Sequence, residues 1–158
     1  MTVKQFMRPE DKKYQVLIAD DCTEDCILLK HALRQTATLE TVTTVVDGQQ
    51  ALAYCQQPNR PDEGTPPHAA PDVVIMEMKM PVEDGSPLLQ ALQTRSVARP
   101  LLVVMAGCPL PMDEQEAVRL GADAFFVKPH FHKELIGMAR EIEQLTWLAH
   151  RPERRQTV

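Results

Sequence analysis

Short apolar runs alternate with segments of helical periodicity along most of the chain. The run QVLIA stops abruptly at Asp20 and Asp21, as expected of a strand that is buried on both faces. In the next segment, Thr23 is placed as an N-cap and apolar residues recur at helical spacing through Gln35. The same alternation predicts strands over residues 15–19, 39–46, 72–76, 101–105 and 124–127, and helices over 23–35, 87–95 and 132–149 and from about 47 and 113.

Strands that alternate with helices favour an open parallel sheet with helices on both faces and right-handed crossover connections. In such a sheet, ligands bind at the carboxyl ends of the strands. The residues that the predicted strands present at this edge are, in order, Asp20 with Asp21, Asp47, Glu77, Met105 and Lys128. The sequence therefore predicts that acidic side chains and one lysine converge near the central strands.

The predicted cluster of Asp20, Asp21 and Glu77 requires a compensating cation, because carboxylates in a small site repel one another. Oxygen ligands of this kind suit Mg²⁺ or Mn²⁺. Lys128 adds a positive charge that can pair with Glu77 or with a bound oxyanion. Acidic groups, a divalent cation and a lysine are the parts of an acyl-phosphate site. We interpret Asp47 instead as a helix cap.

The size, charge and apolar content of the chain exclude some classes of protein. The chain has 158 residues, of which 44% are apolar, enough to bury one compact core. A formal net charge of -5 disfavours nucleic acid as the main ligand, because phosphate binding needs clustered Lys and Arg. No run of about 18 apolar residues offers a membrane span, and the N-terminus lacks the apolar core of a signal peptide. We therefore expect a cytoplasmic protein that binds neither membrane nor nucleic acid.

The cysteines show no metal-binding spacing. We interpret Cys22, Cys26, Cys55 and Cys108 as reduced thiols that act as small buried hydrophobic side chains. A redox sensor that uses Cys22 and Cys108 is an alternative, since both are expected on loops at the carboxyl edge.

The chain divides into an N-terminal extension over residues 1–13, one domain over 14–149 and a C-terminal tail over 150–158. Residues 57–71 are rich in proline and have no periodicity, so we predict a loop insertion there. The chain ends about ten residues after the last predicted helix. We therefore expect no attached DNA-binding or catalytic domain, and an output that goes through another protein.

Three motifs resemble the receiver domain of two-component response regulators. VLIADD resembles its first strand with the acidic pair, PDVVIMEMKMPVEDG its third strand and following turn, and GADAFFVKP its fifth strand with the lysine. The resemblance covers residues 14–148. It implies an α/β fold with a flavodoxin-like, doubly wound, five-stranded parallel sheet of strand order 2-1-3-4-5 and five helices. The proline-rich insertion and the long last helix are most similar to single-domain regulators associated with phytochromes.

The phosphoacceptor position departs from the family. There, a histidine kinase transfers phosphate to an aspartate at the end of the third strand, and Glu77 holds that place here. The resemblance implies Mg²⁺ ligands at Asp20, Asp21, the Glu77 carboxylate and the backbone carbonyl of Lys79, and a phosphoryl-stabilising role for Lys128. The Lys79 ammonium would partly replace the metal, so we expect Mg²⁺ binding to be weakened.

Two switch positions depart as well. The family has a Thr or Ser at the end of the fourth strand, where this chain has Met105, whose thioether donates no hydrogen bond. The switch aromatic maps to Phe125, which has no hydroxyl. Glu is longer than Asp by about 1.5 Å, so its carboxylate reaches toward the place of a phosphoryl group. These departures favour a domain in which Glu77, paired with Lys128, permanently mimics the phosphorylated state, over a domain that is phosphorylated.

The leading hypothesis is an atypical single-domain regulator that is not an enzyme. It would signal through contacts with a histidine kinase or another signalling protein, or as a homodimer through the face formed by residues 113–148, which carries Trp147. The main alternative is a phosphorylatable receiver that uses Glu77 with Mg²⁺-dependent phosphotransfer. A metal-dependent phosphatase or other hydrolase on the same sheet lacks a well-placed nucleophile and general acid.

Overall fold

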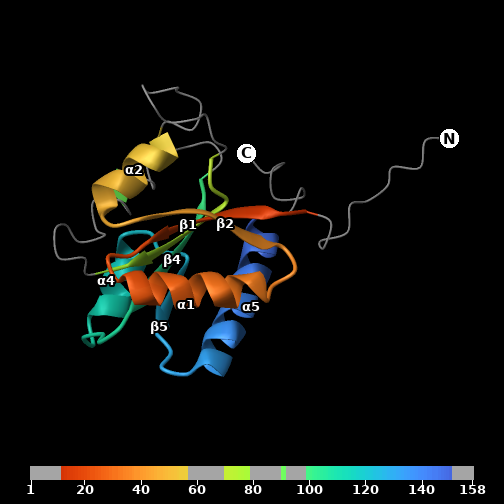
Figure 1. Cartoon of the computed structure of the whole chain (residues 1–158). Coiled ribbons are helices and arrows are strands. Elements are labelled where there is room, and N and C mark those ends of the chain that lie inside the picture. Colours follow the sequence, from red (N-terminus) through yellow and green to blue (C-terminus); the bar gives the residue numbers. More distant parts are fainter. Residues whose placement is uncertain (1–11, 57–69, 79–89, 92–98, 151–158) are drawn as a thin grey trace.

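The computed structural model describes residues 12–56, 70–78, 90–91 and 99–150. Its strands form one parallel sheet of order β2-β1-β3-β4-β5 (Figure 1), which confirms the predicted order. The elements are β1 (Tyr14–Ala19), α1 (Thr23–Arg34), β2 (Leu39–Val45), α2 (Gly48–Gln56), β3 (Val73–Glu77), β4 (Leu101–Ala106), α4 (Asp113–Arg119), β5 (Ala124–Val127) and α5 (His132–Ala149). Of the helix predicted over 87–95, only residues 90 and 91 are described, and both are helical.

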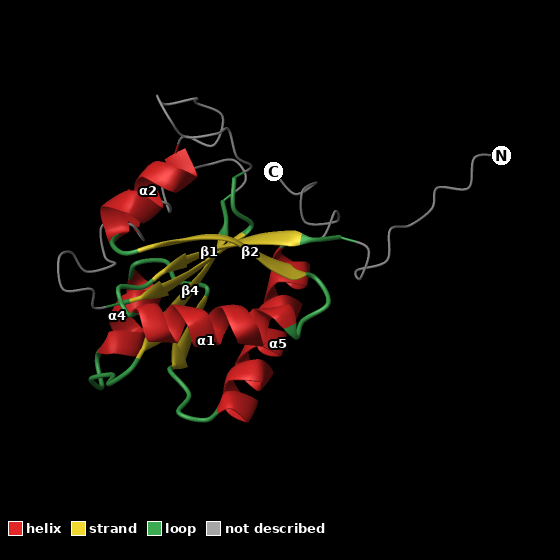
Figure 2. Cartoon of the chain, in the orientation of Figure 1, coloured by secondary structure: helices red, strands yellow, loops and turns green. Residues whose placement is uncertain are grey.

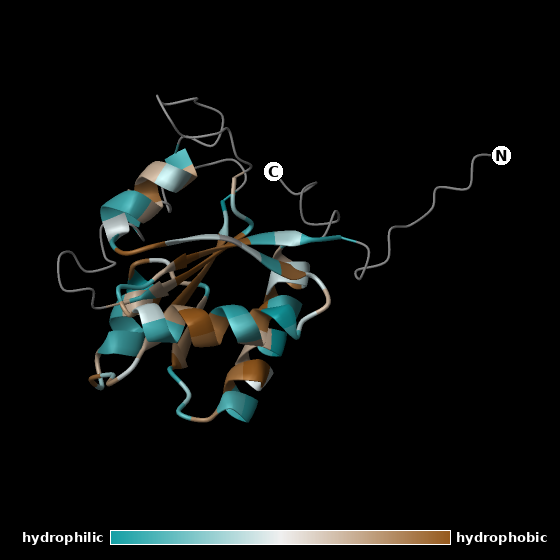
Figure 3. Ribbon diagram, in the orientation of Figure 1, coloured by the Kyte–Doolittle hydropathy of each residue, from teal (hydrophilic) through white to brown (hydrophobic). Residues whose placement is uncertain are grey.

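The helices cover the sheet on both faces (Figure 2), and each face has its own apolar core. Val16 and Ile18 of β1 belong to the core under α1 and α5, whereas Leu17 and Ala19 belong to the core under α2 and α4. This split follows from the alternation of side chains along a strand. The central strands β3 and β4 are accordingly among the most apolar parts of the ribbon (Figure 3), and every residue of both is buried.

The start of α1 and the end of β3 each differ by one residue from the sequence-based expectation. Cys22, and not Thr23, is the N-cap of α1, so the predicted cap was wrong by one residue. The Cys22 N–H donates to Asp20 Oδ1 at 2.9 Å, so the turn between β1 and α1 is held by the strand-end aspartate. Strand β3 runs one residue further than predicted, so Glu77 is its last residue and pairs with Met105 of β4.

Two further expectations can be compared with the described residues. The Asp47 carboxylate accepts the Gln50 N–H at 2.8 Å at the start of α2, which confirms its interpretation as a helix cap. No helix among the described residues is long and apolar enough to cross a membrane. Three regions lie outside the described residues, so the domain boundaries stay predictions: residues 57–69 of the insertion predicted over 57–71, most of the N-terminal extension, and residues 151–158.

Candidate functional site

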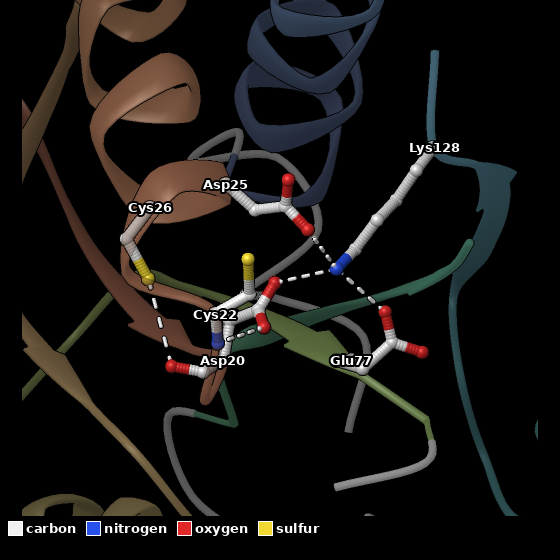
Figure 4. A network of polar contacts seen from close by, with 6 residues as sticks. All are labelled: Asp20, Cys22, Asp25, Cys26, Glu77 and Lys128. Carbon is white, nitrogen blue, oxygen red and sulfur yellow. Dashed lines mark hydrogen bonds and ion pairs between the residues drawn. The ribbon is translucent and has the colours of Figure 1, made fainter. Parts of the chain in front are cut away.

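The ammonium group of Lys128 is the centre of a polar cluster at the carboxyl edge of the sheet (Figure 4). Its Nζ lies 2.8 Å from Asp20 Oδ2, 2.7 Å from Asp25 Oδ2 and 2.7 Å from Glu77 Oε2. We call these four residues the lysine cluster. Asp20 and Glu77 are 3% and 11% exposed and Lys128 is 17% exposed, whereas Asp25 is 40% exposed. Three carboxylates around one ammonium leave a local formal charge of −2.

The sheet places each member of the lysine cluster. Asp20 directly follows β1, Glu77 ends β3 and Lys128 directly follows β5, and parallel strands bring these ends to the same edge. The Lys128 N–H donates to the Ala106 carbonyl at 2.9 Å, which continues the pairing of β4 with β5 by one residue and fixes the root of the lysine. The convergence of Asp20, Glu77 and Lys128 that the sequence predicted is therefore present.

Asp25 belongs to this cluster, although the sequence analysis did not include it. It lies in the first turn of α1, where an acidic residue is also favoured by the helix dipole. Its place in the sequence could have indicated this, because the first turn of a helix that directly follows a strand lies at the same edge of the sheet as the end of that strand. Asp25 therefore adds a third anion to Lys128 and links α1 to the segment after β5.

The remaining predicted acid, Asp21, is exposed. Lys128 pairs instead with Asp20, which precedes Asp21 in the sequence, and with Asp25. Lys79, which the prediction included as a carbonyl ligand, lies outside the described residues. The described carboxylates of the cluster thus come from β1, α1 and β3, and they face an ammonium group.

The protonation of the cluster follows from its contacts. Burial lowers the pKa of Lys128, but hydrogen bonds to Asp20, Asp25 and Glu77 raise it more, so the net pKa lies well above its ordinary value. The hydrogen bond from Lys128 is also the main reason why the pKa of Asp25 is lowered. Lys128 is therefore charged over the whole physiological range, and it is held by more than one partner at a time.

The predicted Mg²⁺ ligands are only partly covered by the described residues, because Lys79 lies outside them. Among the described residues, no group of three or more His, Cys, Asp or Glu side chains is arranged to hold a metal ion. The charge that a divalent cation would supply is supplied in part by the Lys128 ammonium, which lies within hydrogen-bonding distance of each carboxylate of the lysine cluster.

Met105 and Phe125 occupy the switch positions. Met105 is 3% exposed and belongs to the core on the α1 and α5 side. Together with residues of α1 and α5, Pro129 and the lysine itself, it lines a small cavity of about 40 Å³ beside Lys128. Phe125 is partly buried and packs against the core on the α2 and α4 side. Neither side chain offers a hydroxyl to the cluster.

The cysteines are free thiols, but they are not uniformly buried. Cys26 and Cys55 are buried and Cys22 is partly buried, whereas Cys108 is exposed, so its interpretation as a buried hydrophobic residue was wrong. Burial raises the pKa of Cys26, whose thiol donates to the Asp20 carbonyl at 3.5 Å. The redox pairing of Cys22 with Cys108 stays a prediction.

The fold and the chain both match known proteins. A solved structure of the phosphorylated cyanobacterial phytochrome response regulator RcpA is 22% identical and superposes with a TM-score of 0.71 over 88% of this chain and 96% of that one. The Mn²⁺-bound form of response regulator Rcp1 is 23% identical, with a TM-score of 0.68 over 92% and 96%. At these identities the structures establish the fold, and the phytochrome-associated subgroup stays a prediction.

Curated relatives are similar over the same part of the chain. The transcriptional regulatory protein PrrA of Mycobacterium tuberculosis is 29% identical over 128 residues, which is 81% of this chain and 49% of that protein. The chain thus spans about half the length of this relative. The family described as the response regulator receiver domain matches residues 16–140. With the parallel sheet and the acid and lysine positions described above, this match shows that the chain belongs to the receiver domain family of response regulators.

Proposed function

We propose that this chain is an atypical receiver whose signalling state is held by the lysine cluster and does not depend on phosphorylation of an aspartate. The observation that carries the proposal is the ion pair between Glu77 Oε2 and Lys128 Nζ at 2.7 Å. In the family, the lysine at this place contacts a phosphoryl group on the third-strand aspartate. Here the longer Glu77 side chain reaches the lysine by itself.

The surroundings of Glu77 support the same reading. Met105 pairs with Glu77 across β3 and β4, is buried, and cannot donate a hydrogen bond to a phosphoryl oxygen. Lys128 is already held by Asp20 and Asp25, so a phosphoryl group would compete with these carboxylates for the ammonium. Receiver domains act as signalling modules, and this one would act without the usual chemical step.

Output would then depend on a protein partner, such as a histidine kinase or another signalling protein. The face formed by residues 113–148 is the proposed contact surface, and a homodimer is one form of it. Val118, Val127 and Leu148 on this face are 60%, 53% and 41% exposed. Trp147 packs partly against the core, so its apolar area is shared between the fold and any interface.

The decisive experiment compares the response to beryllofluoride, a phosphoryl mimic, with and without Mg²⁺. We expect no response of the wild type and a gained response of Glu77→Asp combined with Met105→Thr. The fluorescence of Trp147, the single tryptophan of the chain, serves as the readout. Glu77→Gln is the matched control, because it keeps the side-chain length and removes the charge. A wild type that responds as fully as the double variant would refute the proposal.

The alternative is a phosphorylatable receiver that uses Glu77, with Mg²⁺ bound more weakly than usual. The position of Glu77 as the last residue of β3, at the place of the family's phosphoacceptor, favours it. It predicts Mg²⁺-dependent incorporation of phosphate from a small phosphodonor, lost in Glu77→Ala. Absence of incorporation into the wild type, beside incorporation into Glu77→Asp combined with Met105→Thr, would exclude this alternative and leave the first.

A further inference from the structure

Two histidines from different helices lie side by side on the surface, and neither belongs to the lysine cluster. The ring centroids of His31 on α1 and His132 on α5 are 5.0 Å apart, with 37° between the ring planes. Both side chains are exposed. Because neither ring is buried, the requirements of the core do not explain why they meet.

The helices that carry the two rings are fixed relative to each other. Leu29 and Leu33 of α1 pack in the same buried core as Leu135 and Met138 of α5. His132 is the first residue of α5, and His31 lies in the second half of α1. The backbones therefore hold two imidazoles close together, while the exposed side chains can still rotate between staggered rotamers.

We propose that His31 and His132 form a binding site for one divalent late transition-metal ion such as Ni²⁺, Cu²⁺ or Zn²⁺. Imidazole nitrogen is a preferred ligand of these ions, and it is a poor ligand of Mg²⁺. Two ligands on rigid neighbouring helices bind one ion more tightly than either ligand alone, because the second contact is intramolecular. The formal net charge of -5 also favours a cation over an anion at the surface of this protein.

The proposed site is open on the solvent side. In the described part of the chain, no third His, Cys, Asp or Glu completes the set of ligands, so water would fill the remaining coordination positions. The ion would tie α1 to the first turn of α5, four residues after Lys128. It would thus stiffen the packing of the same two helices that the buried core connects.

The test is a titration of the full chain without an affinity tag by isothermal calorimetry, with Ni²⁺ as the probe. We expect one ion per chain, and an affinity at least ~10-fold lower in His31→Asn and in His132→Asn. His130→Asn is the matched control, because His130 is also exposed and lies two residues from His132 but is not part of the ring pair. It should bind Ni²⁺ like the wild type.

Two further measurements separate this site from others. A Cys108→Ser background removes the exposed thiol as a competing ligand and should leave the affinity unchanged. Circular dichroism of each variant shows whether the fold is intact. The proposal is overturned if the wild type does not bind Ni²⁺, if the double His31→Asn, His132→Asn variant still binds it with the original affinity, or if binding is lost only with Cys108 or His130. In those cases the two rings make an aromatic contact and no metal site.

Discussion

Acidic residues at the two edges of the sheet differ in what they contact and in how many carboxylates share one partner. At the amino edge, Asp72 accepts the Gln15 N–H at 2.8 Å and Asp123 accepts the Leu102 N–H at 2.8 Å. Each carboxylate there satisfies a backbone donor near the start of a neighbouring strand, and Asp123 also pairs with the guanidinium of Arg99. At the carboxyl edge, the carboxylates of the lysine cluster converge on a single ammonium.

This difference separates carboxylates that accept backbone N–H groups from carboxylates that share one ammonium group. A carboxylate that caps a backbone N–H completes the hydrogen bonding of the fold and brings no like charge close to it. Carboxylates that share one lysine stay under mutual repulsion, and folding tolerates this only while the cation is present. The carboxyl edge therefore has more negative than positive charge, and its stability should be sensitive to the loss of any charged group there.

The largest effect is expected for Lys128→Met. Removal of the ammonium leaves the buried carboxylates of Asp20 and Glu77 beside that of Asp25, and loss of one partner of a buried ion pair costs about 3–5 kcal/mol. Urea unfolding at pH 7 measures this loss in the free energy of unfolding. The loss should shrink as the pH is lowered, because protonation relieves the repulsion. The exposed Lys13, changed to Met, is the control and should have little effect.

A smaller effect is expected at the amino edge. Asp72→Ala leaves the partly buried Gln15 N–H without its side-chain acceptor, and the lost hydrogen bond costs about 1 kcal/mol. Asp72→Asn keeps an acceptor oxygen and should recover most of this loss in the same urea experiment. If Asp72→Asn were as damaging as Asp72→Ala, the charge of this aspartate would matter, and the contrast between the two edges would fail.

The contribution of Asp25 should depend on pH. Its pKa is lowered in the folded protein by the hydrogen bond from Lys128, so it stabilises the fold above its ordinary pKa of 3.8 and loses this contribution as the pH falls through the folded value. Asp25→Asn should therefore lower the free energy of unfolding at pH 7, by at most about 1 kcal/mol because the group is substantially exposed. Unfolding measured at several pH values between 7 and 3 tests this. A difference that stays constant down to pH 3 would show that charge is not the cause.

The sequence was sufficient for the sheet and for most of the lysine cluster. In a parallel sheet, the end of each apolar run fixes which residue reaches the carboxyl edge, so Asp20, Glu77 and Lys128 could be placed from the pattern alone. The strand order came from the resemblance to receiver domains and not from the apolar pattern, and the structure confirms it.

Asp25 could not be placed in this way. Its direction depends on where α1 begins, and a shift of one residue turns a side chain by about 100° around the helix axis. The expected cap at Thr23 was one residue too late, since Cys22 is the N-cap. The contacts of Asp72 and Asp123 escaped prediction for a related reason, because they join residues of different strands and depend on the register between them.

The smallest effect is expected for Asp21→Asn, and it tests the boundary of the lysine cluster. Asp21 adjoins Asp20 in the sequence but is exposed, so its charge is screened by water and its removal should change the free energy of unfolding by no more than about 0.5 kcal/mol. Asp20→Asn, measured beside it, removes a buried partner of Lys128 and should cost clearly more. Equal losses in the free energy of unfolding of the two variants would mean that Asp21 contributes to the lysine cluster as much as Asp20 does. The distinction between paired and solvated acids would then have to be drawn one residue further along the chain.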